Sequence, residues 1–131
     1  MPQVLDSLAA SFSGQPVLVT GATGLIGQRL VQVLAEGGAE VHILSRREDA
    51  VDLWSNPAVV GHVGDLQDSE LLEALCGRVQ SIFHLASYAP ADNDPAPEDN
   101  PEHTKITVEG SANLLAAADQ AGVKSFVFSS S

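Results

Sequence analysis

Val17-Leu-Val-Thr-Gly-Ala-Thr-Gly-Leu-Ile-Gly27 is the stretch of this sequence that decides the fold. It opens with a short apolar run, Val17 to Val19, as expected of a strand that is buried on both faces of a parallel sheet. Glycines then follow at positions 21, 24 and 27, and an amphipathic run after them predicts a helix that ends at Gly37-Gly38. A strand that turns through glycines into a helix offers backbone N–H groups to a phosphate.

Each glycine of the turn has an expected task. Gly21 allows a sharp turn without a Cβ clash. Gly24 lets the backbone approach a pyrophosphate closely, and Gly27 removes a side chain so that the helix can pack near the sheet. A second strand is expected at 40–44, so strand, turn, helix and strand lie within ~30 residues. The spacing is G-x-x-G-x-x-G, and the alternative is a glycine-rich turn that binds no ligand.

Beyond this turn, apolar runs and punctuating residues predict an alternation of strands and helices. Strands are expected at 59–63, 81–85 and 124–129, and helices at 48–54, 68–75 and 104–121, with Asp68 as an N-cap and Gly122 as a helix end. Residues 88–102 are rich in Pro, Asp and Asn and predict a long loop. Alternating strands and helices predict an α/β protein with a parallel sheet.

Thr20-Gly-Ala-Thr-Gly-Leu-Ile-Gly27 resembles the cofactor motif of the extended short-chain dehydrogenase/reductase family, which includes NAD(P)-dependent epimerases/dehydratases and 3β-hydroxysteroid dehydrogenase-like enzymes. Segments 64–66, 84–87, 107–115 and 123–131 match that family in the same order. The resemblance implies a Rossmann-type, doubly wound parallel sheet of about five strands in the order 3-2-1-4-5, with helices on both faces. Residues 1–14 are then an N-terminal extension, and 15–131 resemble the NAD(P)-binding half of a longer enzyme.

Composition narrows the partners that this chain can have. Its 131 residues, 44% of them hydrophobic, are enough for one globular domain. The net charge of −11 argues against binding to nucleic acid or to an anionic membrane surface. No apolar run approaches the ~18 residues that span a bilayer. The start of the chain lacks a basic segment of the secretory kind, and the single Cys76 fits a reducing cytosol, so we expect a cytoplasmic protein.

The end of the second predicted strand bears on the choice of cofactor. NAD sites usually place a carboxylate there to hold the ribose hydroxyls, but this sequence reads Ser45-Arg46-Arg47. Guanidinium groups form charge-assisted hydrogen bonds with a phosphate. We therefore expect NADP rather than NAD, with Arg46 as the main 2′-phosphate ligand and Ser45 assisting. The alternative is a solvated basic turn.

The resemblance implies further cofactor contacts at the carboxyl ends of the strands. Asp65 and Leu66 would border the adenine, and Ser129 the nicotinamide. Thr107 stands where the family often has Asn, whereas His84 is expected to be a packed core residue. The expected cofactor-binding residues are Gly21, Thr23, Gly24, Leu25, Ile26, Gly27, Ser45, Arg46, Arg47, Asp65, Leu66, Leu85, Ala86, Ser87, Thr107 and Ser129.

By resemblance, Ser131 matches the family's catalytic Ser/Thr, which hydrogen-bonds the reacting oxygen of the substrate. The family also uses a Tyr-x-x-x-Lys pair, in which the Lys lowers the pKa of the Tyr. The only tyrosine here, Tyr88, is followed four residues later by Asp92, so the 131 residues hold no such pair. We therefore expect this chain by itself to show no turnover.

Three functions remain open. The first is the NADP-binding domain of an oxidoreductase, epimerase or dehydratase that passes a hydride between nicotinamide and a carbonyl or hydroxyl substrate. The others are a non-enzymatic NADP sensor and a scaffold with an empty site. The family often dimerises, so the resemblance leaves a homodimer open. The acidic loop from Asp92 to His103 lacks regular ligand spacing and favours a solvated loop over a metal site.

Overall fold

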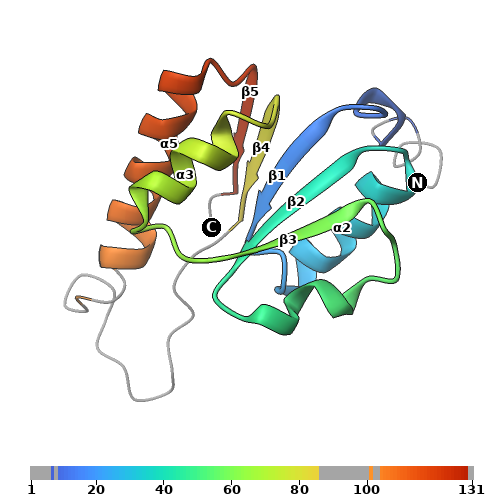
Figure 1. Cartoon of the computed structure of the whole chain (residues 1–131), viewed down its shortest axis with the longest axis horizontal. Helices are drawn as coiled ribbons and strands as arrows, with labels where there is room; N and C mark the ends of the chain where they lie inside the picture. The colour runs from blue at the N-terminus through green and yellow to red at the C-terminus, as the bar shows by residue number, and fades with distance from the viewer. Residues whose placement is uncertain (1–6, 8, 86–100, 102–103, 130–131) are drawn as a thin grey trace.

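The computed structural model describes residues 7, 9–85, 101 and 104–129. These residues form a five-stranded, all-parallel sheet in the order β3-β2-β1-β4-β5 (Figure 1). This confirms the predicted α/β fold and its strand order. The strands are β1 (Pro16–Thr20), β2 (Glu40–Ser45), β3 (Val59–Val63), β4 (Ser81–His84) and β5 (Ser125–Phe128).

Helices lie on both faces of the sheet (Figure 1). Helix α2 (Leu25–Glu36) and the 3₁₀ segment η1 (Glu48–Leu53) pack on one face, and α3 (Ser69–Cys76) and α5 (Gly110–Ala121) pack on the other. None of the helices within the described ranges is long and apolar enough to cross a membrane.

The central strand β1 shows why an uninterrupted apolar run was needed. Side chains alternate across a strand, so Val17 and Val19 join the core under α2, whereas Leu18 joins the core under α3 and α5. All three are completely buried. Since both faces of β1 are covered, its carboxyl end is fixed in the middle of the sheet, where the glycine turn begins.

Two predicted helix ends are confirmed by their geometry. The Asp68 side chain accepts a hydrogen bond from the Leu71 N–H at 3.1 Å and caps α3. Gly122 ends α5 with a left-handed φ of 75°, a conformation that favours glycine.

The range predicted as a helix, 104–121, is helical throughout, but its first part has a different helix geometry. Thr104–Glu109 form the π-helical segment η3, and α5 begins only at Gly110. This part contains the β-branched run Ile106-Thr107-Val108, which favours the α-helix weakly. In addition, the Ser111 hydroxyl donates to the Thr107 carbonyl at 2.5 Å, and such a bond to the preceding turn disturbs regular helix geometry.

Part of the N-terminal extension packs against the sheet domain. Residues 9–11 are helical, and Ala9 is buried beside Gly37, where an added Cβ would lie 2.5 Å from the Ala9 Cβ. The Phe12 ring meets Phe83 of β4 edge-on, with 5.4 Å between ring centroids. Residues 9–12 therefore contribute apolar contacts to the core under α2.

Candidate functional site

The glycine turn between β1 and α2 is closed tightly on itself. Gly21 has a left-handed φ of 69°, and its carbonyl accepts a hydrogen bond from the Gly24 N–H at 3.2 Å. A Cβ on Gly27 would lie 2.1 Å from the Gly21 oxygen and 2.8 Å from the Ala22 Cα. Glycine was predicted at position 27 to let the helix pack near the sheet. In the structure, the missing side chain of Gly27 makes room for the turn at Gly21 and Ala22.

The N-terminus of α2 is suited to an anion. Its N-cap, Gly24, is extended, no side chain of the described residues caps the helix, and its first turn holds no acidic residue. The first N–H groups of a helix have no partner within it, so those of Leu25, Ile26 and Gly27 point outward at the positive end of the helix. The Leu25 and Ile26 side chains are 91% and 71% exposed. These groups fit the pyrophosphate of a dinucleotide.

The carboxyl ends of the strands meet at one edge of the sheet, next to this turn. The Leu85 N–H donates to the Thr20 carbonyl at 3.1 Å, and the Ser129 N–H donates to the His84 carbonyl at 3.1 Å. On the other side of β1, where β2 and β3 end, the Gly64 N–H donates to the Ser45 carbonyl at 2.9 Å. Predicted cofactor residues from five different segments are therefore placed along one edge, where open α/β sheets bind ligands.

Asp65 and Leu66 lie in a turn that α5 holds in place. The Asp65 carboxylate accepts from the Gln67 N–H at 2.8 Å, and buried Leu66 lies so close to Gly110 that a Cβ there would be 2.8 Å from the Leu66 Cδ1. Asn113 donates from its amide to the Leu66 carbonyl at 2.9 Å. The sequence did not single out Asn113 for this role, because its partner is 47 residues away.

The basic end of β2 holds two arginines in different surroundings. The Arg47 guanidinium donates to the Asp49 carboxylate, with its Nε 3.2 Å from Oδ1. The hydrogen bond and the charge of Arg47 lower the pKa of Asp49. No hydrogen bond or ion pair to the exposed Arg46 side chain occurs among the described residues. The Ser45 hydroxyl oxygen accepts from the Arg47 N–H at 3.0 Å, so its own proton remains available to an anion.

A buried chain of hydrogen bonds runs beneath the strand edge. The Leu85 N–H donates to the Thr20 hydroxyl oxygen at 3.1 Å, and that hydroxyl lies 2.6 Å from His84 Nδ1. His84 Nε2 lies 2.7 Å from the Ser111 hydroxyl, which donates to the Thr107 carbonyl. Because the Ser111 hydroxyl proton is donated to the Thr107 carbonyl, Ser111 can only accept from His84. The ring proton of His84 is therefore assigned to Nε2, and Nδ1 accepts from the Thr20 hydroxyl.

This chain explains why a histidine is buried at the end of β4. His84 is 1% exposed, which confirms the predicted core position, and burial lowers its pKa. The neutral ring has one donor and one acceptor, and both are used. Sequence reasoning missed the two partners, which come from β1 and α5. Through them, His84 links the start of the glycine turn to the segment that holds Thr107.

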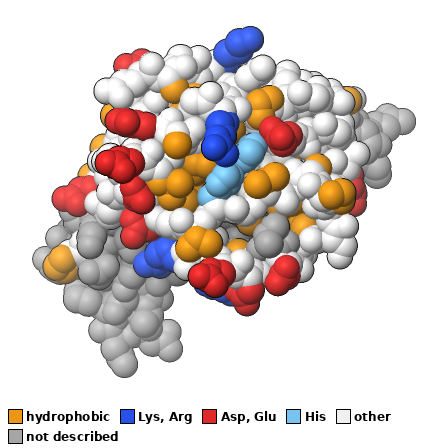
Figure 2. Space-filling view, in the orientation of Figure 1, with side chains coloured by type: hydrophobic (Ala, Val, Ile, Leu, Met, Phe, Trp, Pro, Cys, Tyr) orange, Lys and Arg blue, Asp and Glu red, His pale blue; other side chains and the backbone are white. Residues whose placement is uncertain are grey.

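Two further histidines, His42 and His62, form a pair on β2 and β3. His42 Nδ1 lies 2.9 Å from His62 Nε2, and His42 Nε2 lies 3.1 Å from the Glu40 carboxylate. Histidine side chains gather among apolar side chains on this face, with a basic side chain against them (Figure 2). Burial, followed by the charges of His42 and Arg78, lowers the pKa of His62. Within the described ranges, no three His, Cys, Asp or Glu residues group in a way that could hold a metal ion.

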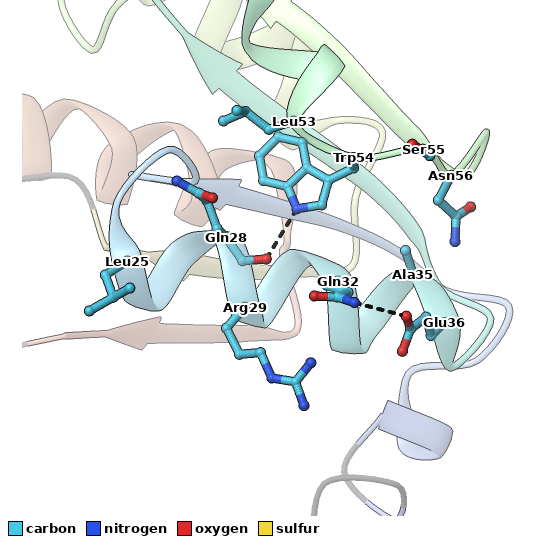
Figure 3. A pocket seen from close by; sticks show the side chains of 10 residues that line it. All are labelled: Leu25, Gln28, Arg29, Gln32, Ala35, Glu36, Leu53, Trp54, Ser55 and Asn56. Carbon is cyan, nitrogen blue, oxygen red and sulfur yellow. Dashed lines mark hydrogen bonds between the residues drawn. The ribbon is translucent and has the colours of Figure 1, made fainter.

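A groove of about 550 Å³ runs along the outer side of α2 (Figure 3). The Trp54 indole N–H donates to the Gln28 carbonyl at 3.1 Å and joins the segment after η1 to α2. Of the predicted cofactor residues, only Leu25 lines the groove, so the groove is not the predicted cofactor site. Its lining residues are Leu25, Gln28, Arg29, Gln32, Ala35, Glu36, Leu53, Trp54, Ser55 and Asn56.

Several predicted residues lie outside the described part of the chain. They are Ala86, Ser87 and Ser131, together with Tyr88 and the acidic loop apart from residue 101. Thr107 is described, is half-buried, and belongs to the hydrogen-bond chain of His84.

A family model agrees with this geometry. The model described as "NAD dependent epimerase/dehydratase family" matches residues 17–131. Among curated proteins, a 3-beta-hydroxysteroid dehydrogenase of Mycolicibacterium neoaurum is 33% identical over 117 residues, which are 88% of this chain and 31% of that protein. This chain thus spans about a third of the length of the curated relatives it matches.

Solved structures show the same fold. An epimerase from Methanothermobacter thermautotrophicus superposes with a TM-score of 0.82 at 29% identity, over 98% of this chain and 38% of that one. A short-chain dehydrogenase/reductase superfamily protein from Agrobacterium tumefaciens, solved with bound NAD, superposes with a TM-score of 0.72 at 32% identity, over 88% of this chain and 32% of that one.

Proposed function

This chain belongs to the NAD dependent epimerase/dehydratase family, and from that premise we propose that it is the NADP-binding domain of an extended short-chain oxidoreductase, epimerase or dehydratase. In the whole protein, a hydride would pass between the nicotinamide and a carbon that bears a carbonyl or hydroxyl group. The cofactor supplies that chemistry, and the residues of this chain bind and orient it.

The uncapped N-terminus of α2 carries the proposal. Its first-turn N–H groups and the close turn at Gly21 and Gly24 form a site for the pyrophosphate. Leu66 beside α5 would contact the adenine, and Leu85 and Ser129 would lie along the nicotinamide half of the molecule. The relatives and solved structures include a 3-beta-hydroxysteroid dehydrogenase and an epimerase, so we propose the substrate of the whole protein only as a carbonyl or hydroxyl compound.

The preference for NADP is proposed from the end of β2. Arg46 is exposed and has no ion-pair partner among the described residues, and the Ser45 hydroxyl has a proton to donate. Hydrogen bonds to charged groups contribute about 1.5–3 kcal/mol each, enough for a preference of roughly tenfold or more. NAD is the alternative cofactor.

Ser131 is proposed as the catalytic hydroxyl of the whole protein, where it would hydrogen-bond the substrate oxygen that is oxidised or reduced. The 131 residues hold no Tyr-x-x-x-Lys pair, and the lack of such a general acid lowers the reaction rate about 10²–10⁴-fold. We therefore propose that this chain binds cofactor without turnover. We also propose a cytoplasmic location and a homodimeric state.

Calorimetric or fluorescence titration with NADPH and NADH tests the cofactor assignment. We expect NADPH to bind at least tenfold more tightly, and Arg46→Ala to remove most of that preference while NADH affinity stays the same. Arg29→Ala, which removes a charge from the groove on α2, is the matched control and should leave both affinities unchanged. Wild-type protein that binds neither nucleotide would refute the proposed function, and an unchanged preference in Arg46→Ala would refute the role of Arg46 alone.

A further inference from the structure

The two adjacent arginines after β2 differ in whether a carboxylate lies beside them. Arg47 meets the Asp49 carboxylate through two guanidinium nitrogens, with Nε 3.2 Å from Oδ1 and a terminal nitrogen 3.5 Å from Oδ2. The neighbouring Arg46 has no such partner among the described residues. One guanidinium is therefore compensated within the protein and the other is available to an external anion.

Local backbone contacts place both partners of this ion pair in one turn. Ser45 Oγ accepts from the Arg47 N–H at 3.0 Å, and the Arg47 carbonyl accepts from the Ala50 N–H at 3.4 Å. These two bonds join the end of β2 to the first turn of η1. They hold Arg47 and Asp49 on neighbouring positions of the same turn, where their side chains meet.

We propose that Asp49 is a specificity-determining residue that holds Arg47 in an internal ion pair, leaves the 2′-phosphate to Arg46 and Ser45, and thereby limits the preference for NADP over NAD. This inference rests on the proposed function. It deepens it, because it predicts that the selectivity of the site is set partly by an acidic residue that binds no cofactor atom.

The expected effect follows from charge. A phosphate monoester carries about −1.5 to −2 charges at pH 7, and the Asp49 carboxylate occupies a guanidinium that could bind it. Arg47 and Asp49 have side chains 61% and 68% exposed, so solvent and salt weaken the interaction. We expect Asp49→Asn to tighten NADPH binding about threefold to tenfold. NADH lacks the 2′-phosphate, and its affinity should change less than twofold.

A double-mutant cycle isolates this role. NADPH and NADH affinities are measured for the wild type, Asp49→Asn, Arg47→Gln and the double variant, at low and high salt. We expect the gain from Asp49→Asn to vanish in the Arg47→Gln background and to shrink at high salt. Asp52→Asn is the matched control, because it removes the same charge from exposed Asp52 of η1, which forms no ion pair in the described structure.

The outcomes separate the inference from the proposed function. Equal gains for Asp49→Asn and Asp52→Asn would overturn the inference, because net charge alone would explain them. A gain that persists in the Arg47→Gln background, or no gain at all, would overturn it as well. In each of these cases a wild type that still prefers NADPH leaves the proposed function standing. A wild type that binds neither nucleotide refutes both.

Discussion

Thr20 and His84 are 64 positions apart in the chain, yet the Thr20 hydroxyl and His84 Nδ1 share a buried hydrogen bond of 2.6 Å. This bond joins the carboxyl end of β1, the central strand, to that of its neighbour β4. The same hydroxyl accepts from the Leu85 N–H. The polar interior of the candidate site is therefore tied to the turn that would hold the pyrophosphate.

Thr20→Val should destabilise the fold, because it leaves the buried Nδ1 of His84 without the Thr20 hydroxyl, whereas the Leu85 N–H keeps the Thr20 carbonyl. We expect a loss of about 1–3 kcal/mol in the free energy of unfolding, measured by urea denaturation. Thr23→Val is the control, since Thr23 lies in the same turn but is not buried. Equal stability of the two variants would contradict the importance of the buried chain.

Gly24 and Gly27 should respond differently to replacement by alanine. A Cβ at Gly24 would lie 3.4 Å from the nearest atom, whereas one at Gly27 would lie 2.1 Å from the Gly21 oxygen. We expect Gly27→Ala to cost about 1–3 kcal/mol of stability, because backbone must move. Gly24→Ala should keep the thermal midpoint nearly unchanged but weaken NADPH binding. A Gly24→Ala variant with normal affinity would argue against close approach of the pyrophosphate there.

Acidification should destabilise the protein through two histidines. The pKa values of His62 and His84 are lowered from 6.5, mainly by burial. Their neutral forms therefore stabilise the fold fully above pH 6.5, and this contribution is lost as the pH falls through their lowered pKa values. Urea midpoints measured between pH 8 and pH 5 should decrease toward low pH. The decrease should be smaller for His62→Gln, and an identical pH profile would refute the contribution of His62.

Cys76 should be unreactive in the folded protein. It is buried, and burial raises the pKa of its thiol to about 11. Because the thiolate is the reactive form, a disulfide reagent at pH 8 should modify the native protein slowly and the urea-unfolded protein rapidly. The sequence has no other cysteine, so the signal reports on this residue alone. Fast modification of the native protein would mean that α3 opens readily.

The sequence could predict what depends on local pattern. The apolar run of β1, the glycine turn and the Asp68 cap each act within a few residues, so their spacing was enough. Contacts between distant side chains were not predictable in this way. Asn113 meets the Leu66 carbonyl across 47 residues, and Trp54 meets the Gln28 carbonyl across 26. Such pairs arise only after the sheet has brought its elements together, and so does the setting of His84.

The position of β1 has a consequence for the order of events during synthesis. This strand leaves the ribosome first among the five, and β2 covers one of its edges soon afterwards. Its other edge waits for β4, whose partner residues follow about 64 positions later. Until β4 is made, the nascent chain exposes one unpaired edge of the apolar strand β1. Chaperones protect intermediates of this kind. The strand that is synthesised first is therefore paired on both edges only after β4 has been made.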